Sequence, residues 1–183
     1  MNQIYIHPKR KTKVVFVQLG SPSKPTTKAL RTYLRKFLGD PRVIDINPWL
    51  WKIILNLFVL PFRPKKSAKL YARIWDGKSF PLITNTRDFT NNVREELKKF
   101  DPNGYVEVNH AFLLSPPYVN EVYDSWEEDL KKGVGATKLL VIPMFPQYSE
   151  STIASGIDAL AKELAKRVKI PTFEVITNFH RTH

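Results

Sequence analysis

Residues 13 to 20 read KVVFVQLG, a run of apolar and mostly β-branched side chains that ends at a glycine. Such a run is typical of a strand buried on both faces, as in a parallel sheet covered by helices. Three further segments have a similar pattern, at residues 105–113, 138–144 and 172–177. We therefore expect four strands, the first of them at residues 13–19.

Segments with helical spacing separate these strands. In TTKALRTYLRKFLGD, residues 26–40, apolar side chains recur along one face and Gly39 supplies a stop. The others are KSAKLYARIW, DFTNNVREELKKF, PPYVNEVYDSWEEDLKKG and IASGIDALAKELAKRV. Strands that alternate with helices imply crossover connections. The pattern predicts an α/β fold, a four-stranded parallel sheet with helices on both faces, similar to a flavodoxin- or Rossmann-type half domain.

The length of 183 residues fits one domain with its own core. We divide the chain into a basic extension, residues 1–12, and a single α/β domain, residues 13–183. The absence of cysteine argues against a disulfide scaffold, a thiolate zinc site or a cysteine nucleophile, and favours a reducing compartment. The amino-terminal residues lack the apolar region of a signal peptide, so we expect a cytoplasmic protein.

The net charge is +12, from 29 Lys and Arg against 17 Asp and Glu. An anionic partner is plausible on this basis: nucleic acid, an acidic membrane surface or a carboxylate-bearing small molecule. The basic clusters at residues 9–13 and 63–66 belong to no recognisable nucleic-acid module. We therefore expect no nucleic-acid partner.

A polar cluster follows the third expected strand. Residues 139–152 read LLVIPMFPQYSEST, so Tyr148, Ser149, Ser151 and Thr152 stand between a strand and a helix. In open α/β sheets, ligands bind beyond the carboxyl ends of the strands, which makes this cluster a candidate site. The alternative is that Ser151 or Thr152 simply caps the following helix.

Residues 47–66, NPWLWKIILNLFVLPFRPKK, carry ten large apolar side chains within fourteen positions and do not fit the simple alternation. The stretch is too short and too interrupted to span a bilayer. Three uses remain: a buried helix, a lip around an apolar ligand, or a segment at a membrane interface beside a basic anchor. The two tryptophans and the cations that follow favour the second and third uses.

Five blocks in the same order and spacing resemble the amino-terminal half of ferrochelatase, the enzyme that inserts ferrous iron into protoporphyrin IX. The blocks are VQLGSP, FLGDPRV, RPKKSAKLYARIW, PLITNTR and IPMFPQYSESTIASGIDAL. The resemblance implies a chelatase-like domain that forms one side of a porphyrin cleft, with an apolar lip over it. It also implies protoporphyrin IX or haem, with ferrous iron, as ligands, and no tightly bound cofactor.

The resemblance also implies the site residues. Leu19 matches a position that faces the macrocycle, Arg63 one that approaches a propionate, and Tyr71 a nearby cleft residue. Tyr148 and the hydroxyl cluster, defined as Ser149, Ser151 and Thr152, match a segment that lines the cleft floor. The expected lip, residues 49–60, contributes the side chains of Trp49, Trp51, Phe58 and Leu60.

Two segments depart from the family pattern. DGKSFPLI either shifts a family serine to Ser79 or replaces it with Phe80, and HAFLLSPP lacks the Arg-Tyr or Tyr-Gly pair of many members. The family's catalytic histidine and its partner carboxylate lie in the carboxyl half, so we assign no catalytic residue here. Metal insertion requires a base that accepts the pyrrole protons, and we therefore expect the isolated chain to be inactive.

The histidines provide little substitute for the missing base. His110 lies within an expected strand, as a core or edge residue. His180 and His183 are three apart and could bind a metal, but two ligands are too few for a tight site. The alternative for this pair is a flexible terminus.

Two functions remain open. The chain either contributes the porphyrin-binding half of a ferrochelatase, or it is a non-catalytic porphyrin- or haem-binding carrier. In both cases we expect a homodimer or a partner that carries the carboxyl-terminal half, because half a cleft leaves an apolar surface uncovered. Peripheral contact of the lip with a membrane is the alternative use of that surface.

Overall fold

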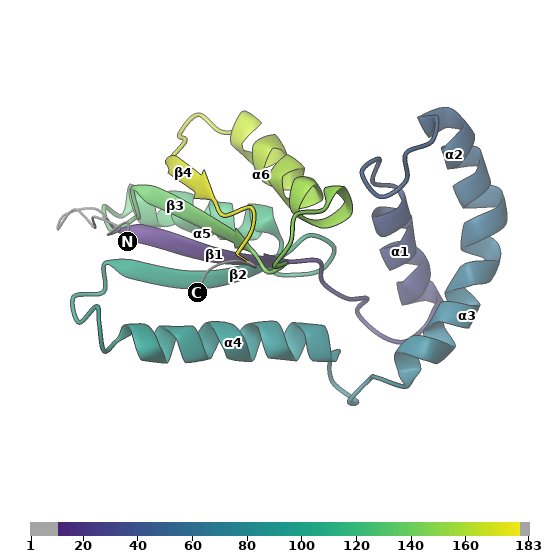
Figure 1. Cartoon of the computed structure of the whole chain (residues 1–183), viewed down its shortest axis with the longest axis horizontal. Helices are drawn as coiled ribbons and strands as arrows, with labels where there is room; N and C mark the ends of the chain where they lie inside the picture. The colour runs from purple at the N-terminus through teal and green to yellow at the C-terminus, as the bar shows by residue number, and fades with distance from the viewer. Residues whose placement is uncertain (1–10, 180–183) are drawn as a thin grey trace.

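The computed structural model describes residues 11 to 179 (Figure 1). Its four strands are β1 (Thr12–Gln18), β2 (Val106–Phe112), β3 (Lys138–Pro143) and β4 (Thr172–Val175). Their order in the sheet is β2-β1-β3-β4, and every neighbouring pair is parallel. The predicted four-stranded parallel sheet is confirmed, and each strand ends within a residue or two of its expected position.

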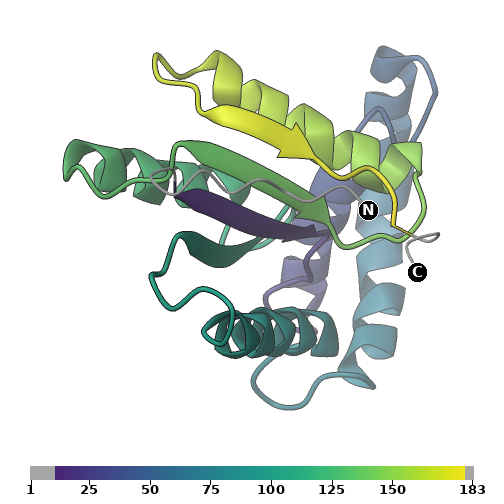
Figure 2. The same ribbon diagram turned by 60° about the vertical axis from the view of Figure 1, so that its left-hand side comes forward.

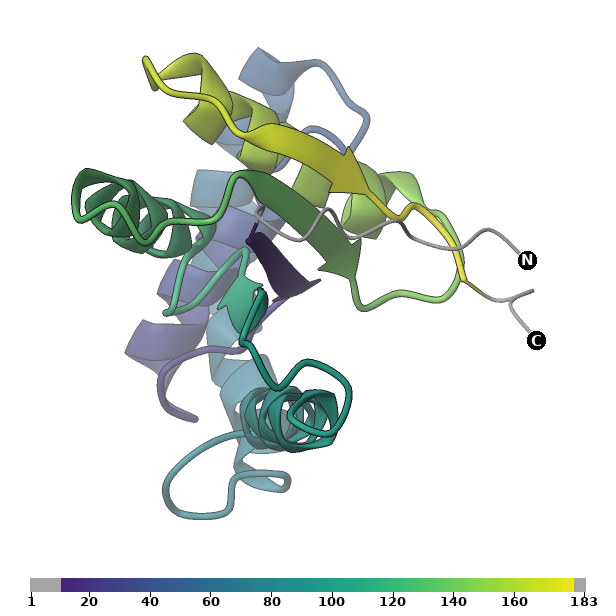
Figure 3. The same cartoon turned by 90° about the vertical axis from the view of Figure 1, so that its left-hand side faces the viewer.

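Alternate side chains of β1 enter two different cores. Three helices pack on the sheet: α4 (Pro81–Leu97), α5 (Val119–Lys131) and α6 (Ser155–Ala165). Val15 and Val17 lie in the core that includes residues of α5 and α6, whereas Val14 and Phe16 lie in the core that includes residues of α4. Helices therefore cover both faces of the sheet, as predicted (Figure 3).

The remaining helices form a helical arm, defined here as residues 27–72. Its elements are α1 (Thr27–Leu38), α2 (Pro48–Ile54), the π-helix η1 (Leu55–Val59) and α3 (Leu60–Ala72). The arm stands beyond the carboxyl ends of the strands and does not cover either face of the sheet (Figures 1 and 2). It has its own small core, formed by Tyr33, Leu34, Leu38, Leu55 and Leu60.

The arm runs through two prolines without a break, which sequence reasoning did not anticipate. Pro61 occupies the first turn of α3, directly after the π-helix, and Pro64 lies inside α3. Proline has no amide hydrogen to donate, and Pro61 lies where the hydrogen-bond pattern changes from a π-helix to an α-helix. The segments expected as a lip and a separate short helix are thus one nearly continuous helical run. Among residues 11–179, no helix is long and apolar enough to cross a membrane.

The turn after β1 brings the sheet and the arm close together. Gly20 has a φ of 92°, in the left-handed region, and a Cβ there would lie 2.4 Å from Ser115 Oγ. Only glycine meets both conditions without strain. The hydroxyl of Tyr33, on α1, donates a hydrogen bond to the Gly20 carbonyl at 3.4 Å. The end of β1, the loop after β2 and the arm are therefore fixed against one another.

Candidate functional site

The carboxyl ends of all four strands meet at one edge of the sheet because the strands are parallel. The π-helix η2 (Glu150–Ala154) follows β3 at this edge and continues directly into α6. Ligands of open α/β folds bind at this edge. The polar segment of residues 148–152 therefore lies where its position after a strand predicted.

The hydroxyl cluster is bonded internally. Ser149 Oγ lies 2.9 Å from Thr152 Oγ1 and 3.2 Å from Ser151 Oγ. Ser149, rather than Ser151 or Thr152, occupies the N-cap position of η2, and its side chain makes no capping hydrogen bond. The capping alternative for Ser151 and Thr152 is therefore wrong. These hydroxyls lie half-buried at the strand edge and remain available to a ligand.

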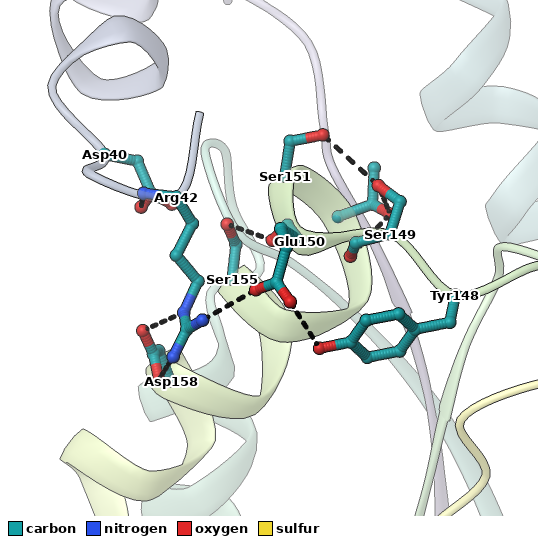
Figure 4. Close-up of polar contacts among 9 residues, drawn as sticks. Asp40, Arg42, Tyr148, Ser149, Glu150, Ser151, Ser155 and Asp158 are labelled. Carbon is teal, nitrogen blue, oxygen red and sulfur yellow. Dashed lines mark hydrogen bonds and ion pairs between the residues drawn. The ribbon is translucent and has the colours of Figure 1, made fainter. Parts of the chain in front are cut away.

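Arg42, which sequence reasoning did not select, joins the helical arm to this segment (Figure 4). Its guanidinium donates to Glu150 Oε2 at 2.8 Å and to Asp158 Oδ1 at 3.0 Å. Tyr148 donates its hydroxyl hydrogen to the other oxygen of Glu150 at 3.1 Å. One arginine thus holds the loop after α1, η2 and α6 together, and its partner Glu150 orients Tyr148.

The hydrogen bonds of this network shift the pKa values of Asp158 and Tyr148. Hydrogen bonds from Arg42 lower the pKa of Asp158, since they stabilise the carboxylate. The hydrogen bond that Tyr148 donates to Glu150 raises the pKa of the Tyr148 hydroxyl, because it stabilises the protonated form. Tyr148 therefore remains a neutral hydrogen-bonding group and offers no base.

A cavity of about 280 Å³ lies beside this network, between the ends of β1 and β2, the arm and α6. Leu19 and Ser151 both line it, so the structure brings together two of the predicted site residues. Leu113 and Leu114 form part of its wall, at the segment where the chain lacks the family's Arg-Tyr pair. The cavity combines this apolar wall with polar and charged groups, among them Asp158, Lys162 and Glu163 on α6.

The four predicted lip residues separate into two groups. Trp49 and Phe58 are 77% and 64% exposed, on the outside of the arm. Trp51 is half-buried and donates its indole hydrogen to the Leu38 carbonyl at 2.6 Å, while Leu60 is buried in the arm core. In this structure Trp51 and Leu60 hold the arm together, and Trp49 and Phe58 present the apolar surface.

Arg63 and Tyr71 lie on α3. Arg63 is exposed and makes no ion pair with another described residue, so its guanidinium is free to meet an anion. Tyr71 packs between aromatic rings, 6.2 Å from Tyr33 and 5.4 Å from Phe80 between ring centroids. Burial, followed by the charge of Tyr71, raises the pKa of Tyr33. Tyr71 is thus part of an aromatic packing cluster at the base of the arm.

The segment DGKSFPLI resolves into two structural roles. Asp76 Oδ1 accepts hydrogen bonds from the amides of Lys78 at 2.7 Å and Ser79 at 2.6 Å, which forms a tight turn. Phe80 is 2% exposed and packs on Trp75 at 4.7 Å between ring centroids. Phe80 therefore supports the junction of α3 and α4 from the inside, while Ser79 stays half-buried in the turn.

The predicted metal pair cannot be placed. His180 and His183 lie outside the described residues. Within residues 11–179, no group of three or more His, Asp or Glu side chains is arranged to hold a metal ion. His110 lies on the edge strand β2, half-buried, with its Nδ1 buried and without a hydrogen-bond partner among the described residues. It does not line the cavity beside Leu19.

Comparison with known proteins agrees with this arrangement. The family model described as Ferrochelatase matches residues 11–183. The chain belongs to the ferrochelatase family. Similar ferrochelatases include those of Idiomarina loihiensis, 42% identical over 167 residues, and Marinobacter nauticus, 39% identical over 168 residues. Each match covers 91% of this chain and 44% of the relative.

The name of a third relative specifies a tetrapyrrole, coproporphyrin III. The coproporphyrin III ferrochelatase of Streptococcus mutans is 38% identical over 171 residues, a match that covers 93% of this chain and 51% of the relative. The chain thus spans about half the length of the curated relatives it matches. The matches span nearly the whole chain, as does the family model.

Proposed function

We propose that this chain supplies one side of the porphyrin cleft of a ferrochelatase, for the step of haem biosynthesis in which ferrous iron enters protoporphyrin IX. The observation that carries the proposal is the meeting of Leu19, at the end of β1, and Ser151, after β3, on one cavity wall. Membership of the ferrochelatase family supports this interpretation of the cavity, because the relatives that the chain matches are named ferrochelatases.

The chemistry of the site suits a flat apolar ring that carries carboxylates. Leu19, Leu113 and Leu114 offer an apolar wall, and Ser151 of the hydroxyl cluster offers a hydrogen-bonding group beside it. Arg63 is the proposed partner of a propionate, since guanidinium groups pair well with carboxylates. The cavity of about 280 Å³ is at or below the usual lower limit of ligand pockets, roughly 300 Å³. A second protein surface is therefore proposed to complete the cleft.

Binding without turnover is the expected behaviour of the isolated chain. Metal insertion needs a base positioned near the pyrrole nitrogens. No histidine among the described residues lines the cavity, and Tyr148 is held in its neutral form. The carboxylates that line the cavity, those of Asp40, Asp158 and Glu163, are each engaged by a hydrogen bond or an ion pair. Ferrous iron would be a substrate of the completed enzyme, and this chain would contribute porphyrin binding.

The test is a visible absorption titration of protoporphyrin IX with the purified chain, with and without ferrous iron under anaerobic conditions. We expect a saturable change in the porphyrin Soret band and no conversion to the spectrum of haem. A titration without any spectral change would refute porphyrin binding. Conversion to haem by the chain alone would refute its inactivity and would require a base among residues assigned here to other roles.

A non-catalytic carrier of porphyrin or haem is the second candidate, and the lack of a positioned base supports it. Addition of the separately produced carboxyl-terminal half of the Idiomarina loihiensis ferrochelatase distinguishes the two functions. Iron insertion by the mixture, absent from either part alone, would support the ferrochelatase half. A carrier should instead bind haem at least as tightly as protoporphyrin and remain inactive in the mixture.

A further inference from the structure

A second cavity, of about 320 Å³, opens on the other side of Leu114 and Tyr118. It lies between the loop from β1 to α1, the first half of α1 and the loop after β2. Leu114 and Tyr118 border both cavities, so the two sites are neighbours with a shared wall. The function proposed above makes no use of this second cavity.

The lining of the second cavity is basic and rich in hydroxyl groups. Lys24, Lys28 and Lys36 line it together with Ser21, Thr26 and Ser115, and none of the described lining residues is acidic. Lys24 and Lys28 make no ion pair with any described side chain. Lys36 donates to the hydroxyl of Tyr118 at 2.9 Å, which leaves its charge uncompensated. The site therefore has a local excess of positive charge.

The amino terminus of α1 points to the same chemistry. The helix has twelve residues and no acidic side chain in its first turn. Thr26 accepts a hydrogen bond from the Ala29 amide at 3.3 Å, and the other first-turn amides have no side-chain cap. Free amides and the helix dipole favour an anion at this position.

Ser21 supplies an independent sign of a ligand. It is 6% exposed, it lines the cavity, and its hydroxyl has no hydrogen-bond partner among the described residues. The Ser21 amide donates a hydrogen bond to the hydroxyl oxygen of Ser115 at 3.3 Å. Ser115 is the acceptor in this bond, so its own hydroxyl hydrogen can be donated to another group. The Ser21 oxygen is not among the fully buried side-chain atoms of the described residues that lack a partner, so within this buried residue it is the cavity that the hydroxyl can reach. An acceptor inside the cavity would satisfy both serines.

We propose that this cavity binds a small oxyanion, with a phosphate group as the ligand that fits best. Lys24 and Lys28 supply the charge, and Ser21, Ser115 and the amides of α1 supply the hydrogen bonds. Charge-assisted hydrogen bonds of this kind are the stronger ones in proteins. A carboxylate, including a propionate of a porphyrin in the neighbouring cavity, shares this chemistry. Oxyanion binding in this cavity does not require a porphyrin in the neighbouring cavity.

The first measurement is a calorimetric titration of the full chain with inorganic phosphate at constant ionic strength. The double variant Lys24→Gln/Lys28→Gln should weaken binding about tenfold or more, since two charged donors are lost. Ser21→Ala, which removes only a buried hydroxyl, should weaken it severalfold. The control Lys131→Gln/Lys132→Gln removes the same charge at the far end of α5 and should bind like the parent.

A second arm identifies the source of the oxyanion. If the ligand is a free phosphate, protoporphyrin should bind the Lys24→Gln/Lys28→Gln variant as tightly as the parent, and phosphate should not compete. If it is a propionate, the variant should bind protoporphyrin more weakly and phosphate should compete. The absence of saturable phosphate binding, or equal binding by both double variants, would overturn the site. A failed porphyrin titration with retained phosphate binding would overturn only the proposed function.

Discussion

Arg42 connects parts of the chain that are more than a hundred residues apart in sequence. Its partners Glu150 and Asp158 are 108 and 116 residues away. The contact with Asp158 is bidentate, and both contacts are charge-assisted. Nothing in its local sequence, FLGDPRV, indicates these partners, because an exposed arginine after a proline is ordinary in a loop. Long-range side-chain pairs of this kind need a structure. The hydroxyl cluster was predictable because its signal, a polar run after a strand, is local.

Arg63 gives a prediction for a single residue. Arg63→Ala should weaken protoporphyrin binding about tenfold or more, because it removes a charge-assisted contact to a propionate. Fluorescence quenching titrations of the parent and the variant measure the change. Arg35→Ala, which removes an exposed arginine from α1, serves as the control. Equal affinity of the Arg63 variant and the parent would reduce Arg63 to a surface charge.

His110 gives a prediction for pH dependence. Burial, followed by the charges of Arg94 and Arg87, lowers the pKa of His110 below its usual 6.5. The unfolded chain therefore binds a proton at higher pH than the folded chain, and folding stability falls as the pH drops below about 6.5. The loss stops once the folded histidine is also protonated.

Urea unfolding of the parent and of His110→Gln at pH 7.5 and 5.5 measures this effect. The parent should lose more unfolding free energy on acidification than the variant, which lacks the titrating ring. The difference between the two proteins isolates His110 from the other histidines. An equal loss in both would show that His110 titrates alike in the folded and unfolded states.

At the scale of elements, the described residues include two π-helices, and η2 carries Ser151 of the proposed site. η1 interrupts the outer helix of the arm, and η2 opens the helix that follows β3. Such π turns are rare and occur frequently at functional sites. Residues 149–155 illustrate the geometry: the Ser149 carbonyl accepts the Ala154 amide at 3.3 Å, five residues ahead. Sequence periodicity does not reveal a single added residue in a turn, so both were missed.

The strands, in contrast, were predictable from residues such as Val14 to Val17, because burial on both faces leaves an uninterrupted apolar run. The helical arm was harder to predict from the sequence, because its prolines and polar residues interrupt the apolar pattern. Pro61 bounds the expected lip, yet it lies in the first turn of α3, and Pro64 lies buried inside the same helix. Lys13 also departs from simple patterning: it is 1% exposed and paired with Glu107 at 3.2 Å.

The contact of Arg42 with η2 and α6 predicts which segments become more mobile when the contact is removed. Arg42→Ala should release the loop after α1, because the described residues offer Glu150 and Asp158 no other arginine. Hydrogen–deuterium exchange should then become faster at the loop of residues 40–47 and in η2, with little change in β1. Asp158→Asn should reproduce most of the effect, and the double variant should add little to it. Unchanged exchange in η2 would mean that other contacts hold the two parts together.

At the scale of the whole molecule, the arm carries a large apolar surface. The exposed residues on α2, η1 and the start of α3 are Trp49, Leu50, Ile53, Leu57, Phe58 and Phe62. Soluble domains rarely leave such a patch uncovered. The surface fits a second copy of this chain, a partner with the carboxyl-terminal half, or a membrane surface.

A homodimer is the outcome we predict for the purified chain on its own. Light scattering at increasing protein concentration should show a mass above 21.2 kDa, the mass of one chain. Trp49→Ser/Phe58→Ser should remain monomeric, since both side chains are exposed and the arm core is left intact. Parent chains that stay monomeric but float with anionic vesicles would assign the surface to a membrane instead.

The central claim is that a porphyrin binds at the carboxyl edge of the sheet, between the arm and η2. Amide chemical shifts of the isotope-labelled chain, recorded as protoporphyrin IX is added, test it most directly. The account predicts the largest changes at residues 19–20, 113–114 and 148–152, and little change at the opposite edge, near residues 101–104. Shifts confined to that opposite edge, or to the face of α4, would contradict it.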